Sequence, residues 1–313
     1  MGRYALRRLL QAIPVLVGTT FFIFVIVYAL PGDPIQALGG DRRMDPVIAR
    51  ALRDKFGLDD PLLVQYWHYL TGIFSGNFGT TFRGVEVSSI FAGKFQVTLQ
   101  LALTALVMEA IIGVGLGLWS ALRRGRWQDQ FVLAVTLLLV SIPPLVMGFV
   151  LQLWLGVKFK LGTGIELVPV AGIGAGEKSY LLPGFVLATT SIAYLTRLTR
   201  TSLMETLRSD FIRTAVAKGM PRRRVLGRHA LRNSLIPLVT YLGADLGALM
   251  GGAVITETIF NLPGIGLQLF QSVYLRENTV VVGIVTVLVL IYVVANLVVD
   301  LLYAVLDPRI RYE

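Results

Sequence analysis

Residues 197–236 read RLTRTSLMETLRSDFIRTAVAKGMPRRRVLGRHALRNSLI, a polar insert of forty residues between two long apolar runs. Ten of its side chains are Lys or Arg, and two, Glu205 and Asp210, are acidic. A segment this charged does not enter the hydrocarbon core of a bilayer, and an excess of Lys and Arg marks the cytoplasmic side of membrane proteins. The insert therefore predicts a membrane protein with a large cytoplasmic segment between two of its spans.

The whole chain has the composition of an integral membrane protein. Of its 313 residues, 55% are apolar and 15% are charged, and the mean hydropathy is +0.69, which is far from the composition of a domain with a water-facing surface. A helix needs on the order of 20 residues to cross a bilayer. The prediction is an all-α protein with six transmembrane helices, at residues 9–30, 97–122, 131–157, 181–196, 236–256 and 279–306.

The distribution of charge orients these spans. With both termini in the cytoplasm, the cytoplasmic segments carry 18 Lys or Arg and the outer segments carry 11, although the outer segments are longer in total. The cytoplasmic parts are then residues 1–8, 123–130, 197–235 and 307–313. The net charge of +10 is thus an orientation signal and argues against nucleic-acid binding. The first apolar run is longer than a secretory signal's core and lacks a small-x-small cleavage pattern, so we expect a retained helix.

The longest polar stretch, residues 31–96, falls outside the membrane and has seven acids and seven bases. We expect a small folded cap. Asp45 followed by a proline is typical of a helix start. Two helices are predicted in this cap, at residues 46–56 and 62–74. Tyr66, Trp67 and Tyr69 of the second helix are expected at the level of the lipid headgroups.

Two features of the spans predict how their helices pack. Gly113, Gly115 and Gly117 in the second span are spaced to allow another helix to approach closely. Pro143 and Pro144 in the third span predict a kink or a break, because proline removes a backbone donor. Such a break often lines a pathway.

The sequence offers no convincing catalytic or metal-binding motif. It has no cysteines, and its two histidines, His68 and His229, are predicted on opposite sides of the membrane. His229 lies among arginines, without a nucleophile to activate. The stretch GIGAGEKS at residues 172–179 lacks the glycine that a phosphate-binding loop needs directly before its lysine. We therefore expect a non-catalytic chain with no metal site and no cofactor of its own.

Three acids lie within predicted spans: Glu109, Asp245 and Asp300. Ionisable groups at this depth usually face a bundle interior, a water path or a partner charge. Asp300 lies near the cytoplasmic end and could anchor Arg309 or Arg311. For Glu109 and Asp245, a structural role and a role in a translocation pathway stay open. Glycines around Asp245 predict a slim, closely packed helix on which a carboxylate could meet a substrate ammonium group.

Within the insert, the local pattern is helix, turn, helix. Residues 211–218 are good helix formers, Gly219 with Pro221 ends that helix, and residues 222–235 start another. Glycine at this position permits a sharp turn.

Two segments of the insert resemble the coupling-loop signature of inner-membrane permeases of ABC importers, in particular the B-type permease of the peptide/nickel branch. They are RTAVAKG at residues 213–219 and HALRNSLIP at residues 229–237. Arg213 stands where the general signature has Glu, and Arg232 where it has Pro; both departures are familiar in the peptide branch. Shorter matches extend over nearly the whole chain, at residues 7–9, 30–34, 58–66, 76–79, 256–264 and 300–311.

The resemblance implies a type I ABC importer permease fold in a bacterial plasma membrane, with residues 97–306 as the core permease domain. Its implied partners are a homologous second permease, two cytoplasmic ATPases that bind ATP and Mg, and an extracytoplasmic peptide-binding protein docked on the cap. Substrate, a dipeptide or oligopeptide, would move inward by alternating access. The residues implied to couple the ATPases to the spans are Arg213, Thr214, Ala215, Val216, Ala217, Lys218 and Gly219.

Two alternatives stay open. The same architecture could import nickel, haem or glutathione, since a binding protein would set the selectivity. A proton-coupled secondary transporter that uses Glu109 and Asp245 belongs to a different class. It leaves the glycine-hinged loop unexplained, and the two halves of the chain show no obvious internal repeat.

Overall fold

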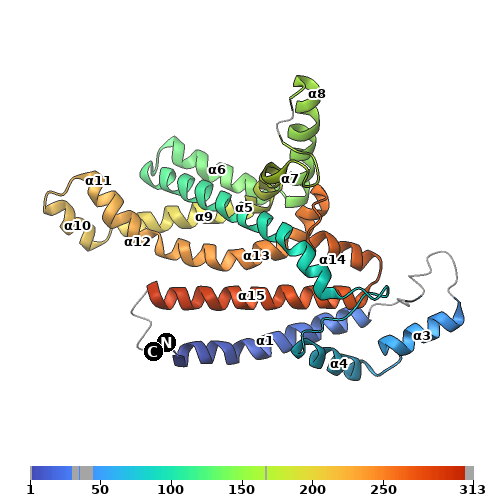
Figure 1. Ribbon diagram of the computed structural model, residues 1–313. Helices are drawn as coiled ribbons and strands as arrows, with labels where there is room; N and C mark the ends of the chain where they lie inside the picture. The colour runs from blue at the N-terminus through green and yellow to red at the C-terminus, as the bar shows by residue number, and fades with distance from the viewer. Residues whose placement is uncertain (1, 30–34, 36–44, 166–167, 307–313) are drawn as a thin grey trace. The chain divides into compact units, whose positions relative to one another are not determined.

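The computed structural model describes residues 2–29, 35, 45–165 and 168–306, and these are almost entirely helical (Figure 1). The β contact seen in this part of the chain is a single isolated bridge, Thr80 to Glu86. Six helical segments are long and apolar enough to cross a membrane, which confirms the predicted number. They are Leu10–Tyr28, Val87–Leu122, Pro144–Thr163, Gly176–Leu207, Ile236–Phe260 and Asn278–Val298.

The chain forms two compact units. The first comprises Met1–Thr98 and Leu262–Leu297, and the second comprises Leu99–Asn261 and Val298–Glu313. The first unit contains α1 (Gly2–Ala29), α3 (Pro46–Phe56), α4 (Leu62–Phe74), the start of α5 (Val87–Leu122), α14 (Ile265–Tyr274) and most of α15 (Asn278–Leu306).

The two helices predicted for the outer segment are α3 and α4, with the expected bounds. The Asp45 side chain accepts a hydrogen bond of 2.8 Å from the Val47 backbone N–H, so the predicted helix cap is present. Gly57, with a φ of 58°, ends α3 in the left-handed conformation that glycine adopts most readily. The start of the cap at residues 31–34 and 36–44 lies outside the described residues.

The aromatic residues of α4 hold the first unit together, where the sequence had placed them at the lipid headgroups. Tyr66 is 8% exposed, and its hydroxyl donates to the Val17 carbonyl of α1 at 3.0 Å. Tyr69 donates to Thr286 Oγ1 of α15 at 2.6 Å. Burial raises the pKa of the Tyr69 phenol, so it stays a neutral donor. Each of these two tyrosine hydroxyls thus finds a partner inside the protein, and Trp67 alone of the three is exposed. Their position at the level of the lipid headgroups stays a prediction.

The second unit is built around α9 (Leu181–Leu207), which contacts α6, α7 and α13. Its other elements are α6 (Trp127–Ser141), α7 (Pro144–Leu151), η1 (Gln152–Lys158), α8 (Phe159–Thr163), η2 (Gly176–Tyr180), α10 (Asp210–Ala217), α11 (Arg222–Arg224), η3 (Val225–Leu231), α12 (Arg232–Ser234) and α13 (Ile236–Phe260). The rest of α5 also belongs to this unit.

The predicted third span, residues 131–157, is broken at its prolines. Helix α6 ends before Ile142, which is extended, and α7 begins at Pro144. A π-helical turn, η1, follows, and in it Gln152 Nε2 donates to the Val170 carbonyl at 2.6 Å. The predicted kink is therefore present, and a side-chain amide bonds a nearby backbone carbonyl as expected for irregular helix inside a membrane protein.

Two of the three glycines in α5 are in close contact with α9. A Cβ at Gly113 would lie 3.0 Å from Leu195 Cβ, and one at Gly117 would lie 2.5 Å from Thr199 Cβ. At Gly115, no atom would come within 4 Å, so the predicted close approach was wrong there. Gly115 points to the other side of the helix, because successive helical residues are rotated by about 100°.

Replacing Gly117 by alanine should therefore destabilise the protein, and replacing Gly115 should not. Gly117→Ala forces a Cβ against the Thr196 carbonyl oxygen at 2.6 Å and against Thr199, and overpacking of this kind costs about 1–3 kcal/mol. Gly115→Ala is the matched control, since it gains helix propensity without a clash. The melting temperature in detergent measures both. Equal melting temperatures for the two variants would contradict the close contact of α5 with α9.

Candidate functional site

The insert folds as predicted, into two helical segments joined by a glycine turn. Helix α10 occupies Asp210–Ala217, one residue short of the predicted range at its end. Gly219 has a φ of 75°, and its N–H donates to the Val216 carbonyl at 2.9 Å. Chain direction reverses there, and α11, η3 and α12 follow without interruption. Figure 1 shows these segments beyond the end of α9, in gold.

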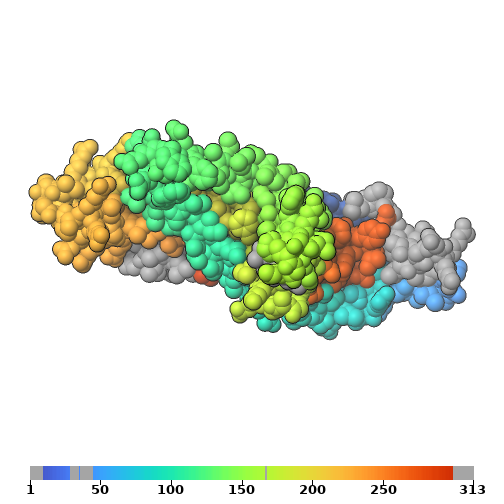
Figure 2. Space-filling view, turned by 90° about the horizontal axis from the view of Figure 1, so that it is seen from above, coloured from blue at the N-terminus to red at the C-terminus, as the bar shows by residue number. Residues whose placement is uncertain are grey.

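One face of α10 is buried in a small apolar cluster. Ile212 and Ala215 point into it and are 5% and 7% exposed. The other buried members are Ala121 of α5, Leu203 of α9, and Val225 and Ala230 of η3. In Figure 2 the gold atoms of the insert lie directly against the green atoms of the neighbouring helices. The insert is thus a folded part of the second unit.

Two large apolar side chains of α10 border the buried face, one on each side, and are exposed to solvent. Phe211 is 47% exposed and Val216 is 59% exposed. Arg213, Thr214 and Ala217 are exposed beside them. Ala215, one of the two alanines expected to let the helix enter a groove, instead faces the internal cluster. An exposed apolar face on a charged segment is typical of a protein interaction site.

A buried ion pair fixes α6 to α9 near the insert. Asp129, in the first turn of α6 and 2% exposed, accepts from Arg200 Nε at 2.7 Å and from a second guanidinium nitrogen at 2.9 Å. Ser120 Oγ and the Gly125 N–H complete the carboxylate's hydrogen bonds. Such a bidentate pair is strong and directional. The pair could not be predicted from the sequence, because nothing local distinguishes Arg200 among the ten basic residues of the insert.

The two acids assigned to a translocation pathway do come together. Glu109 of α5 is fully buried, and its carboxylate interacts with Asp245 of α13 and with Ser191 of α9. Tyr241, one turn before Asp245, interacts with the same group of side chains. Neither oxygen of Glu109 has a hydrogen bond of good geometry among the described residues. The structure thus brings the two acids together with two hydroxyl groups and leaves the oxygens of Glu109 incompletely satisfied, which is uncommon for buried polar groups.

The glycines near Asp245 predicted close packing of α13. Among those whose surroundings are described, only one has a neighbour in close contact. A Cβ on Gly252 would lie 3.3 Å from Leu187 Cδ1, whereas Gly251 has open space around it. The predicted partners Arg309 and Arg311, and the side chain of Asp300, lie outside the described residues.

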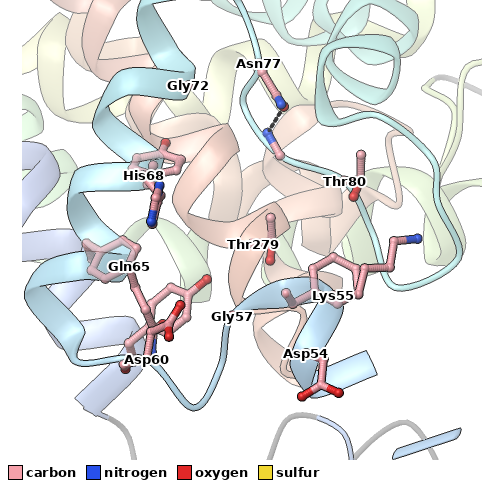
Figure 3. A pocket seen from close by; sticks show the side chains of 15 residues that line it. Asp54, Lys55, Gly57, Asp60, Gln65, His68, Gly72, Asn77, Thr80 and Thr279 are labelled. Carbon is pink, nitrogen blue, oxygen red and sulfur yellow. Dashed lines mark hydrogen bonds between the residues drawn. The ribbon is translucent and has the colours of Figure 1, made fainter. Parts of the chain in front are cut away.

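The outer cap contains a cavity of about 420 Å³ within the first unit (Figure 3). His68 and Gln65 of α4 form one wall, and Asp54 and Lys55 belong to α3 on another. Gln65 Nε2 donates to the Asp60 carbonyl at 2.7 Å and so holds the turn between the two helices. The cavity combines both signs of charge. His68 is far in sequence from His229, and the described residues contain no group of three His, Cys, Asp or Glu that could hold a metal ion.

Six candidate spans with a folded basic insert between the fourth and fifth fit the transmembrane subunit of an ABC importer, and the comparison with known families shows that class. The chain belongs to the family described as the binding-protein-dependent transport system inner membrane component, which it matches over residues 113–312. Residues 1–102 match the N-terminal part described for the same kind of membrane component. The resemblance seen in the sequence is thereby confirmed.

Curated relatives match the chain over its full length. It is 36% identical over 314 residues to the glutathione transport system permease protein GsiC of Salmonella typhimurium, with all of both chains covered. It is 35% identical over 338 residues to the dipeptide transport system permease protein DppB of Escherichia coli strain K12, again with full coverage of both. An inward-facing structure of the MetNI methionine ABC transporter has a TM-score of 0.58 at 17% identity, covering 70% of this chain and 97% of that one, and shows that the fold is shared.

Breaking the ion pair should destabilise the second unit. Asp129→Asn leaves the Arg200 charge without its counterion in a mostly buried place, and removal of one partner from such a pair costs about 3 kcal/mol. Asp210→Asn is the matched control, because the Asp210–Arg213 contact of 3.3 Å is largely exposed and such pairs contribute little. Unfolding of the purified variants measures both. A fully stable Asp129→Asn variant would show that the pair does not hold α6 to α9.

Proposed function

We propose that this chain forms one half of the membrane pathway of an ATP-driven importer of short peptides. The main support is the exposed face of α10. This helix belongs to a folded insert in a chain from a binding-protein-dependent transport family. The names of two full-length relatives support the substrate class, since one is a dipeptide permease and the other a glutathione permease. Glutathione, the alternative cargo, is itself a tripeptide, so both names fit short peptides.

The proposed assembly contains four kinds of subunit in a bacterial plasma membrane. A homologous permease pairs with this chain, two ATPases bind the cytoplasmic inserts, and an extracytoplasmic binding protein delivers peptide to the outer cap. ATP and Mg are bound by the ATPases, which carry out the hydrolysis. Family membership favours this arrangement over the proton-coupled secondary transporter.

The attachment of α10 to the membrane helices explains how ATPase movement would be coupled to transport. Ile212 and Ala215 are in one cluster with Ala121 of α5 and Leu203 of α9, so a displacement of α10 carries both helix ends with it. Helix α5 bears Glu109, twelve residues before Ala121, which is about 18 Å along a helix. The segment after Gly219 leads directly into α13, which bears Asp245. A movement at the ATPase contact is therefore transmitted to α5 and α13, the two helices that carry the buried acids.

Glu109 and Asp245 are proposed to meet the peptide's ammonium group as it crosses. A carboxylate in a low-dielectric site attracts a cation strongly, and peptides carry an α-ammonium at neutral pH. Ser191 and Tyr241 add hydroxyls to the same place. The two acids would thus offset the loss of hydration that the ammonium group suffers inside the membrane.

Polar substitution of the exposed face of α10 should abolish ATPase binding. In Phe211→Ser/Val216→Ser, the apolar contact is lost while the buried face is untouched, so the chain should fold normally and fail to co-purify with its ATPases in mild detergent. Val47→Ser, at an apolar residue of the cap that is even more exposed, serves as control. Retention of both ATPases by the double variant would show that α10 does not bind them.

Removing the charge of Asp245 should slow transport. Hydrogen bonds to charged groups contribute about 1.5–3 kcal/mol, so Asp245→Asn should lower ATP-dependent uptake of a labelled dipeptide into proteoliposomes at least about tenfold. Glu177→Gln, at an exposed acid outside the cap, is the control, and co-purification of the ATPases verifies assembly. Unchanged uptake by a normally assembled Asp245→Asn complex would contradict the pathway role.

A further inference from the structure

A second cavity, of about 550 Å³, lies where the insert joins α13. It is lined by Arg228, His229, Arg232, Asn233, Leu235, Ile236 and Val239. These residues follow one another along η3, α12 and the first turn of α13, which is the boundary between the basic insert and an apolar span. In the coupling proposed above, this segment serves as the connection into α13, and the side chains that line the cavity have no role of their own.

The residues that line the cavity change from basic to apolar along the chain. Arg228 and Arg232 are four residues apart, and Ile236 follows after four more, so the three recur along one side of the helical path. The arginines are on the side of the insert, and Ile236 and Val239, which are 40% and 49% exposed, are on the side of the membrane. A ligand that fits this order has a charged end in the cytoplasm and an apolar end in the bilayer.

The polar end of the cavity is prepared for an anion. Arg228 and Arg232 are exposed, and within the described part of the chain no ion pair joins either of them to an acid. Guanidinium groups bind phosphate oxygens bidentately. Beside them, Asn233 Nδ2 donates to the His229 carbonyl at 2.7 Å. The Nε2 atom of His229 is buried without a hydrogen-bond partner among the described residues, and such an atom needs one.

We propose that this cavity binds an anionic phospholipid of the cytoplasmic leaflet. The phosphate contacts Arg228 and Arg232, the glycerol or headgroup oxygens reach His229, and one acyl chain lies along Ile236 and Val239. Basic pockets on the cytoplasmic side of membrane helices are suited to such headgroups. A free phosphate would leave the apolar half of the cavity unused.

The inference is tested by lipid binding to the assembled, purified transporter. The probe is a fluorescent phosphatidylglycerol, titrated in detergent micelles and competed with unlabelled phosphatidylglycerol or phosphatidylcholine. Arg228→Gln/Arg232→Gln should weaken binding about thirtyfold, from the contribution of two basic residues near an anionic lipid surface. Arg222→Gln/Arg223→Gln removes the same charge from exposed residues outside the cavity and should leave binding nearly unchanged.

A third variant separates the sources of the phosphate. Val239→Asn keeps both arginines and should weaken binding of phosphatidylglycerol while leaving that of glycerophosphoglycerol, the same headgroup without acyl chains, unchanged. An equal loss of phosphatidylglycerol binding in Arg228→Gln/Arg232→Gln and in Arg222→Gln/Arg223→Gln would indicate a non-specific charge effect and would overturn the proposal. So would tight binding of inorganic phosphate or glycerophosphoglycerol on its own, or a wild-type complex that binds no phosphatidylglycerol because a partner subunit fills the cavity.

Discussion

The packing of α10 onto the ends of α5 and α9 is the interaction on which the proposed function depends. Ile212 and Ala215 supply the apolar contact, and the Asp129–Arg200 pair fixes α6 to the same end of α9. A basic loop without these contacts could bind a partner but could not transmit force. Because the insert is folded into the second unit, a contact made at Phe211 or Val216 acts on membrane helices.

The same arrangement explains why polar groups are tolerated inside this protein. Asp129 is satisfied by four hydrogen bonds and so serves the structure. Glu109 is equally buried, yet its oxygens have no bond of good geometry in the described chain. An incompletely satisfied acid at membrane depth costs stability. The contrast between these two acids is the physical basis for our proposal that Asp129 serves the architecture and Glu109 the pathway.

Patterns of a few adjacent residues correctly predicted helix starts, turns and breaks. Contacts between residues far apart in the sequence were not predicted. The Asp45 cap, the glycine turn at Gly219 and the break at Pro143 each depend on a few adjacent residues, and all three are present. The contact of Tyr66 with Val17 was not predicted because the two residues are 49 positions apart, and Asp129 and Arg200 are 71 positions apart. Glycine spacing identified a contact face of α5 but included Gly115, which periodicity places on the opposite side.

Rigid attachment of α10 to α9 is tested most directly by a distance measurement. The chain has no cysteines, so spin labels on Ala217→Cys and Thr201→Cys, both exposed positions, report a single pair when the partner subunits are also made free of cysteine. The account predicts the same distance distribution with and without trapped nucleotide, because α10 and the end of α9 move as one body. A shift of several ångströms on nucleotide binding would show that α10 moves independently and would contradict it.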